Sequence, residues 1–228
     1  MQTSDRGLLA LIRHEGVVPG PYLDVKDVWT FGIGHTAAAG PPDPARMTRG
    51  MPADLDAGIR EAFRLFHADL ATYEVEVLRT VKVPLEPHEF DALVSFHYNT
   101  GGIAKALLTR HLNAGDRVAA AAAFMSWLRP AAIRSRRETE RDLFAKGRYP
   151  TGTIPVWSVD RNGRVDFSRP IRRLSETEAL ALLRPLLNPP STPMSPAPST
   201  AATSTAPVQA APSLTTRIFT FLKTLIGA

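Results

Sequence analysis

The sequence lacks cysteine altogether, so its 228 residues contain no disulfide bond and no thiolate metal ligand. The N-terminal residues also lack a basic segment followed by a long apolar run, and they therefore do not read as a secretory signal or a signal anchor. These two absences fit a chain made in a reducing cytoplasm. No cluster of metal-ligating residues stands out, and we expect neither a metal nor a cofactor.

Acidic residues are outnumbered: 27 Lys and Arg face 22 Asp and Glu, which gives a net charge of +5. A basic chain suits an anionic polymer. Nucleic acid would be the usual candidate, but the sequence shows neither a basic strand interleaved with aromatic residues nor a recognition-helix pattern. We expect no nucleic-acid partner, and nothing in the sequence indicates more than a monomer.

The stretch from 8 to 36 carries the chemistry that the sequence offers. Apolar residues recur at helical spacing up to Glu15, with Ser4 as a possible N-cap and Gly16 after the last turn. A carboxyl at a helix C-terminus with apolar neighbours is expected to favour its protonated form. Asp24 lies between two predicted strands, beside a turn, and is expected to stay ionised.

Two carboxyls in unlike settings are what glycoside hydrolysis requires, although a solvated helix-end Glu and an ordinary turn Asp explain the same pair. The wider pattern is more specific. Glu15, Asp24 and Thr30, followed by the run 32–36 (GIGHT), resemble the catalytic signature of the bacteriophage lysozymes, the muramidases of glycoside hydrolase family 24.

The resemblance implies a role for each position. Glu15 would be the general acid, and Asp24 with Thr30 would hold and activate water. Substrate contacts would come from Gly32, Gly34, Thr36, Phe96 and Asn99, although Phe96 also suits the core and Asn99 also suits a helix cap. His35 would be structural, tying the hairpin to the next segment, with proton transfer as the alternative.

One position departs from the family pattern, which usually has glycine three residues after the catalytic aspartate. Asp27 stands there instead. Aspartate tolerates the left-handed conformation better than most residues, so we expect the turn to survive. The added carboxylate either lies in solvent or alters the ionisation of Asp24.

The remaining pattern predicts an α+β fold that is mainly α, with a small β-hairpin lobe, a helical lobe and an active-site cleft between them. A loop over 37–51 is followed by expected helices at 52–81, 87–99, 103–112, 116–127 and 133–146. In the last of these, Arg136, Arg137 and Glu140 match a family pattern and are interpreted as surface ion pairs. Attraction to wall phosphates is the alternative.

We divide the chain into a catalytic domain over 1–150, a hairpin-helix extension over 151–188, a Pro/Ala/Ser/Thr linker over 189–213 and an amphipathic helix over 214–228. The extension is expected to decorate the helical lobe, or else to be a small wall-contact module. The final segment is too short to span a membrane and suits either an anionic membrane surface or docking on protein.

The resemblance implies an endolysin-type lysozyme that hydrolyses the β-1,4 bond between N-acetylmuramic acid and N-acetylglucosamine in peptidoglycan. Such an enzyme, made in the host cytoplasm, would reach the wall after a holin opens the membrane, or from a phage particle. The enzymatic alternative is a lytic transglycosylase acting on the same bond. The non-enzymatic alternative is a wall-binding or virion structural module.

Overall fold

The computed structural model describes residues 1–187. The predicted linker over 189–213 and the predicted amphipathic helix over 214–228 lie outside this range. Among residues 1–187, no helix combines the length and the apolar composition needed to cross a membrane.

The first helix, α1 (Asp5–Glu15), begins and ends as predicted. Ser4 is its N-cap, and the Ser4 Oγ accepts a hydrogen bond from the Gly7 amide at 3.1 Å. Gly16 follows the last turn with φ 69° and ψ 179°, a backbone conformation that only glycine adopts readily. The chain therefore turns sharply immediately after Glu15.

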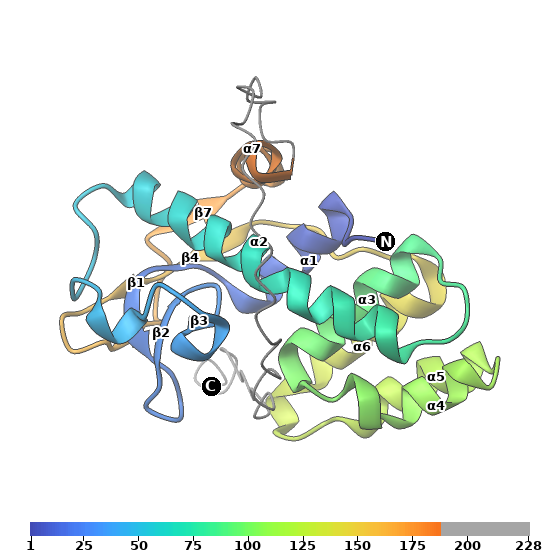
Figure 1. The fold of residues 1–228 in the computed structure, drawn as a ribbon. Coiled ribbons are helices and arrows are strands. Elements are labelled where there is room, and N and C mark those ends of the chain that lie inside the picture. Colours follow the sequence, from blue (N-terminus) through green and yellow to red (C-terminus); the bar gives the residue numbers. More distant parts are fainter. Residues whose placement is uncertain (188–228) are drawn as a thin grey trace, which may run out of the picture.

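A three-stranded antiparallel sheet follows, in the order β1 (Val18–Leu23), β2 (Trp29–Gly32) and β3 (His35–Thr36). The loop predicted over 37–51 contains two short 3-10 helices, η1 (Ala37–Ala39) and η2 (Pro44–Arg46). The long α2 (Leu55–Thr80) then runs from the sheet to the helical part of the molecule (Figure 1).

The helical lobe is built around α3 (Pro87–Thr100), in which every residue from Glu89 onward is buried. The other helices are η3 (Ile103–Lys105), α4 (Leu107–Asn113), α5 (Arg117–Ala123), η4 (Phe124–Ser126), η5 (Ala131–Ile133) and α6 (Arg134–Lys146). The mainly helical α+β fold with two lobes is as predicted.

The helix predicted over 103–112 is not continuous. Ala106 has extended backbone angles, φ −70° and ψ 142°, and it separates η3 from α4. The Thr109 hydroxyl donates to the Ile103 carbonyl at 2.6 Å and occupies an acceptor that a continuous helix would use. The helix predicted over 116–127 likewise ends at Ala123 and continues as the 3-10 helix η4.

The segment after α6 forms two small sheets and a helix. β5 (Ser158–Val159) pairs with β6 (Val165–Asp166) as the predicted hairpin, whereas β4 (Ile154–Val156) pairs with the unpredicted β7 (Arg172–Leu174). The helix α7 (Glu176–Leu187) starts with the expected capping box, because the Glu178 carboxylate accepts from the Ser175 amide at 2.8 Å.

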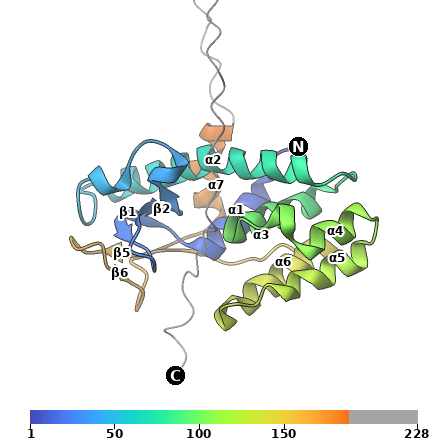
Figure 2. The ribbon, with the colours of Figure 1, turned by 60° about the horizontal axis from the view of Figure 1, so that its bottom comes forward.

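This extension packs against β1, α1 and α2. Figures 1 and 2 both show β1 and β2 on the same side of the molecule as the extension strands, and α7 against α2. Ile154, Val156, Leu174 and Leu183 belong to the main hydrophobic core. The expectation that the extension decorates the helical lobe is therefore wrong. Its apolar residues cover the small lobe and α1 instead.

Candidate active site

Glu15, the last residue of α1, is buried and forms an ion pair with Arg136 of α6. The Arg136 Nη1 lies 2.6 Å from the Glu15 Oε1, and the two side chains are 7% and 3% exposed. The partners are 121 residues apart in the chain. This contact fixes one carboxylate oxygen of Glu15 and leaves Oε2 on the other side of the group.

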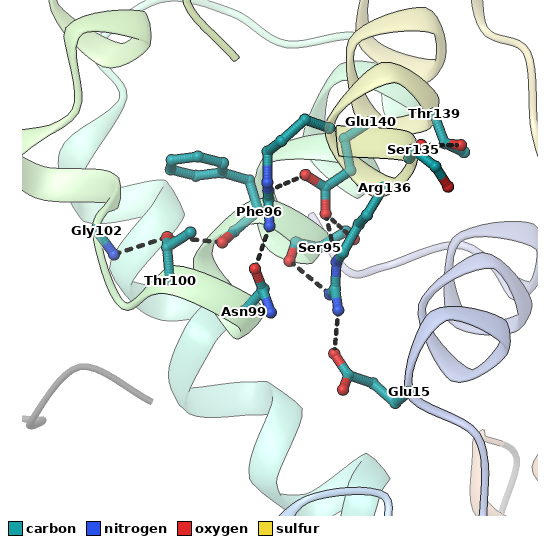
Figure 3. Close-up of polar contacts among 11 residues, drawn as sticks. Glu15, Ser95, Phe96, Asn99, Thr100, Gly102, Ser135, Arg136, Thr139 and Glu140 are labelled. Atoms are coloured by element: carbon teal, nitrogen blue, oxygen red, sulfur yellow. Dashed lines mark hydrogen bonds and ion pairs between the residues drawn. The ribbon is translucent and has the colours of Figure 1, made fainter. Parts of the chain in front are cut away.

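Arg136 is held in turn by other buried groups of the helical lobe (Figure 3). Its Nε donates to the Glu140 Oε1 at 2.9 Å, and its Nη2 donates to the Ser95 carbonyl at 3.2 Å. Arg137 also pairs with Glu140 and donates to the Asn99 side-chain oxygen. The guanidinium that touches Glu15 thus has three fixed acceptors and one orientation.

The charges within this network balance when Glu15 is ionised, because two guanidiniums then face two carboxylates. Burial alone would lower the pKa of Arg136, but the nearby Glu15 and Glu140 outweigh burial and raise it. For Arg137, burial dominates and lowers the pKa. The structure thus places a guanidinium against Glu15, where the sequence predicted apolar neighbours.

The interpretation of Arg136, Arg137 and Glu140 as surface ion pairs is also wrong, since all three are buried. A sequence signal for this was present. These three residues share one helical face with Leu143 and Phe144, at spacings of one, four, seven and eight. Leu143 and Phe144 are among the few apolar residues of the helix, so their face must point to the core. The charged residues on the same face must then point inward as well.

Asp24 lies at the β1–β2 turn, half-buried, in a different environment. Its Oδ1 accepts from the Lys26 amide at 2.8 Å and from the Val28 amide at 2.9 Å. Asp27 has the left-handed φ of 57° that was expected of it, and its side chain is exposed. The turn therefore survives the loss of the usual glycine, and two backbone amides hold the Asp24 carboxylate.

Thr30 pairs with Tyr22 across the β1–β2 hairpin and has no exposed surface. Its hydroxyl donates to the Val28 carbonyl at 3.0 Å. Since the Val28 amide donates to Asp24, Thr30 supports the Asp24 carboxylate through one residue. For Thr30 to hold a water directly, the residues that bury its side chain would have to move.

Gly32 and Thr36 of the signature serve packing in this structure. A Cβ added to Gly32, which has φ 66°, would lie 2.8 Å from the Ala62 Cβ of α2. Gly34 has φ 90°. Thr36 is buried and pairs with Thr30 in the sheet. The absence of a side chain at Gly32 lets the sheet approach α2.

His35 ties three segments together, as its structural interpretation expected. Its Nδ1 lies 3.0 Å from the Asp69 Oδ2 on α2, and its Nε2 lies 2.8 Å from the Pro42 carbonyl oxygen in the following loop. Both ring nitrogens therefore face acceptors, and Asp69 is itself buried.

Phe96 and Asn99 lie inside the helical lobe. Phe96 is fully buried and packs edge-on against Phe124 and Trp127, which contradicts its predicted contact with sugar. Asn99 is buried and accepts from Arg137. Neither the Phe96 nor the Asn99 side chain is exposed at the surface in this structure.

A pocket of about 560 Å³ lies beside β1, and its lining includes Pro19, Phe31 and Glu61. The lining does not include Glu15, Asp24 or Thr30, so this pocket is separate from the predicted catalytic residues. Within residues 1–187, no group of three His, Asp or Glu side chains is placed to hold a metal ion.

Comparison with known proteins adds a family to this geometry. The sequence model described as Phage lysozyme matches residues 12–140. An endolysin of Salmonella phage P22 is 33% identical over 150 residues, which cover 63% of this chain and 98% of the relative. A SAR-endolysin of Escherichia phage Mu is 33% identical over 142 residues, covering 59% of this chain and 76% of the relative.

Solved structures agree with the sequence match. An endolysin from the Escherichia coli O157:H7 phage FAHEc1 superposes with a TM-score of 0.57 at 28% identity, covering 66% of this chain and 98% of its own. A P22 lysozyme mutant gives a TM-score of 0.53 at 31% identity, with coverages of 63% and 98%. The matched region contains Glu15, Asp24, Thr30 and Arg136, and the chain therefore belongs to the phage lysozyme family and is a lysozyme.

Proposed function

We propose that this lysozyme hydrolyses the β-1,4 bond between N-acetylmuramic acid and N-acetylglucosamine in peptidoglycan, with Glu15 as general acid and Asp24 as the second carboxyl. The observation that carries this proposal is the contrast between the two groups. Glu15 is buried and fixed by a guanidinium, while Asp24 is half-buried and held by two backbone amides. Glycosidases require such a division of roles between two carboxyls.

The contact with Arg136 defines where the proton of Glu15 resides when it acts. Because Arg136 Nη1 donates to Oε1, the proton to be transferred is carried by Oε2. Arg136 acts as a positioning residue and does not itself touch the proton.

Asp24 is assigned the task of stabilising the developing oxocarbenium ion and directing a water to the anomeric carbon. The amides of Lys26 and Val28 hold its Oδ1, so Oδ2 remains for the water. Thr30 supports this arrangement through Val28. Glycan contacts are assigned to the hairpin residues from 25 to 28, which are exposed beside Asp24.

The test is hydrolysis of purified peptidoglycan by the wild type and by Glu15→Gln, with analysis of the released ends. Glutamine keeps the shape and can still accept from Arg136, but it has no proton to give, so the rate should fall by about 10²–10⁴-fold. Glu138→Gln is the matched control, since Glu138 lies on α6 in a long, exposed pair with Arg134.

Each outcome distinguishes the alternatives. Ordinary reducing ends together with an inactive but folded Glu15→Gln support hydrolysis. Release of 1,6-anhydro ends identifies a lytic transglycosylase. Binding to peptidoglycan without release of fragments identifies a wall-binding module. If Glu15→Gln keeps wild-type activity, Glu15 is not the acid.

We also propose that the C-terminal residues 214–228 bring the enzyme to an anionic membrane surface. In this sequence, apolar residues at helical spacing alternate with Arg217 and Lys223, and a Pro-rich stretch over 189–213 precedes them. Docking of the same residues on protein is the alternative. Binding of the full chain to vesicles that contain anionic lipid distinguishes the two.

A further inference from the structure

The extension that follows the family match hydrogen-bonds to the chain beside both proposed catalytic carboxyls. At one end, the Val17 amide donates to the Pro155 carbonyl at 3.0 Å, and the Trp157 amide donates to the Val17 carbonyl at 2.8 Å. At the other end, the Leu23 amide donates to the Gly163 carbonyl at 2.8 Å. Val17 comes two residues after Glu15, and Leu23 directly precedes Asp24.

Side chains of the extension also bury the strand between these two anchors. Val18 and Tyr22 form a small hydrophobic cluster with Trp157 and Val159. The approach is close at the Glu15 end, where a Cβ on Gly16 would lie 2.8 Å from the Trp157 Nε1. Gly16 is therefore required both by its backbone angles and by the extension. The extension therefore holds both ends of β1 through hydrogen bonds and packs against the side chains of Val18 and Tyr22.

The second anchor depends on a tight turn between β5 and β6. The Asp160 Oδ1 accepts from the Asn162 amide at 2.8 Å and from the Arg164 amide at 2.9 Å. Gly163 has φ 81°, and a Cβ there would lie 2.7 Å from the Trp29 ring. These bonds aim the Gly163 carbonyl at the Leu23 amide. The exposed Asp160 carboxylate thus stabilises a turn that contacts both strands of the β1–β2 hairpin.

We propose that residues 154–164 form a brace that positions Glu15 and Asp24 relative to each other, an inference that rests on the proposed function of those two carboxyls. β1 is the only chain segment between them, and the brace holds both of its ends. The matched family region stops at residue 140, so the brace is supplied by chain outside it. Trp157, Asp160 and Gly163 are its positioning residues.

A brace of this kind has a physical purpose. The small sheet has few strands, and short isolated hairpins are marginally stable. The turn that carries Asp24 is exposed from Val25 to Val28. A misplacement of about 1 Å at a reacting group costs about 10²-fold in rate, so an anchor on Leu23 affects turnover directly.

The test compares Asp160→Ala with Asp160→Asn in the full chain. Alanine removes the acceptor for both turn amides, whereas asparagine keeps an Oδ1 in the same place. Asp166→Ala is the matched control, because Asp166 is exposed in the same extension and its Oδ1 also accepts two hydrogen bonds, both from Ser168. We measure kcat and KM on soluble glycan oligomers, the thermal midpoint and amide hydrogen exchange.

For Asp160→Ala we expect kcat to fall about tenfold while KM stays within about twofold, since positioning rather than binding is lost. The amides of Leu23, Lys26 and Val28 should exchange about tenfold faster, while amides of α3 keep their protection. Asp160→Asn and Asp166→Ala should both resemble the wild type. The thermal midpoints of the two alanine variants should agree.

The brace is refuted if Asp160→Ala keeps wild-type kcat, or if Asp166→Ala loses as much activity. It is also refuted if faster exchange spreads to α3, because that pattern marks general destabilisation. Failure of the proposed function looks different. In that case Glu15→Gln keeps its activity, while the exchange of Leu23, Lys26 and Val28 still reports whether Asp160 holds the hairpin.

Discussion

His97 should make the stability of this lysozyme strongly dependent on pH. The imidazole lies on α3, is 2% exposed and packs edge-on against Tyr73. Neither ring nitrogen has a hydrogen-bond partner among residues 1–187. Burial lowers the pKa of His97 from 6.5 to about 4, opposed only weakly by the carboxylate of Glu76. The perturbation we consider is acidification of the buffer.

The sign and size of the effect follow from proton linkage. Between pH 6.5 and about 4, His97 binds a proton in the unfolded chain but not in the folded chain. The free energy of unfolding therefore decreases as the pH falls. At 1.36 kcal/mol per pH unit, this range corresponds to about 3 kcal/mol. The loss begins near pH 6.5, is complete near pH 4, and is absent above pH 7.

The assay is urea unfolding of the wild type and of His97→Phe at several pH values from 7.5 to 4. Phenylalanine keeps an aromatic ring against Tyr73 and does not titrate, so the stability difference between the two proteins should change by about 3 kcal/mol in favour of the variant. His88→Gln is the control, because it removes a half-buried imidazole from the same helix. Parallel pH curves for wild type and His97→Phe would refute the reasoning.

Three further outcomes are expected. Arg136→Lys should lower kcat by about 10²-fold with little change in KM, because an ammonium cannot keep the forked contacts that orient Glu15; unchanged kcat would contradict this. Asp69→Ala should lower the free energy of unfolding by about 1–3 kcal/mol, since it removes the carboxylate oxygens that face the buried His35 Nδ1; urea unfolding near neutral pH measures the loss. Deletion of residues 189–228 should leave hydrolysis of isolated peptidoglycan within about twofold and abolish binding to anionic vesicles, whereas vesicle binding by the truncated chain would exclude the membrane role.

Features that depend on neighbouring residues could be predicted from the sequence. Ser4 and Gly16 bound α1 because capping and positive φ are local requirements. Asp27 takes the left-handed conformation for the same reason. The helices over 55–80 and 87–100 follow from apolar periodicity, which depends only on the turn of the helix. The catalytic signature is also local, so the family could be inferred before any contact was known.

The surroundings of those same residues could not be predicted in this way. The sequence left Phe96 open between a sugar contact and the core and placed Arg136 on the surface, and the structure buries both. Their burial depends on which helices pack together, and that packing depends on contacts among residues far apart in the chain. The break at Ala106 was missed because a side chain, Thr109, competes for a backbone carbonyl.

The sequence by itself determined α1, α2, α3 and the β5–β6 hairpin, and it carried the signature from which the family was inferred, because each of these depends on residues close together in the chain. Only the tertiary structure decided that Arg136 faces Glu15 and that Gly163 anchors Leu23. These contacts join segments more than 100 residues apart. Their formation depends on burial and chain closure across the molecule, which no local pattern encodes.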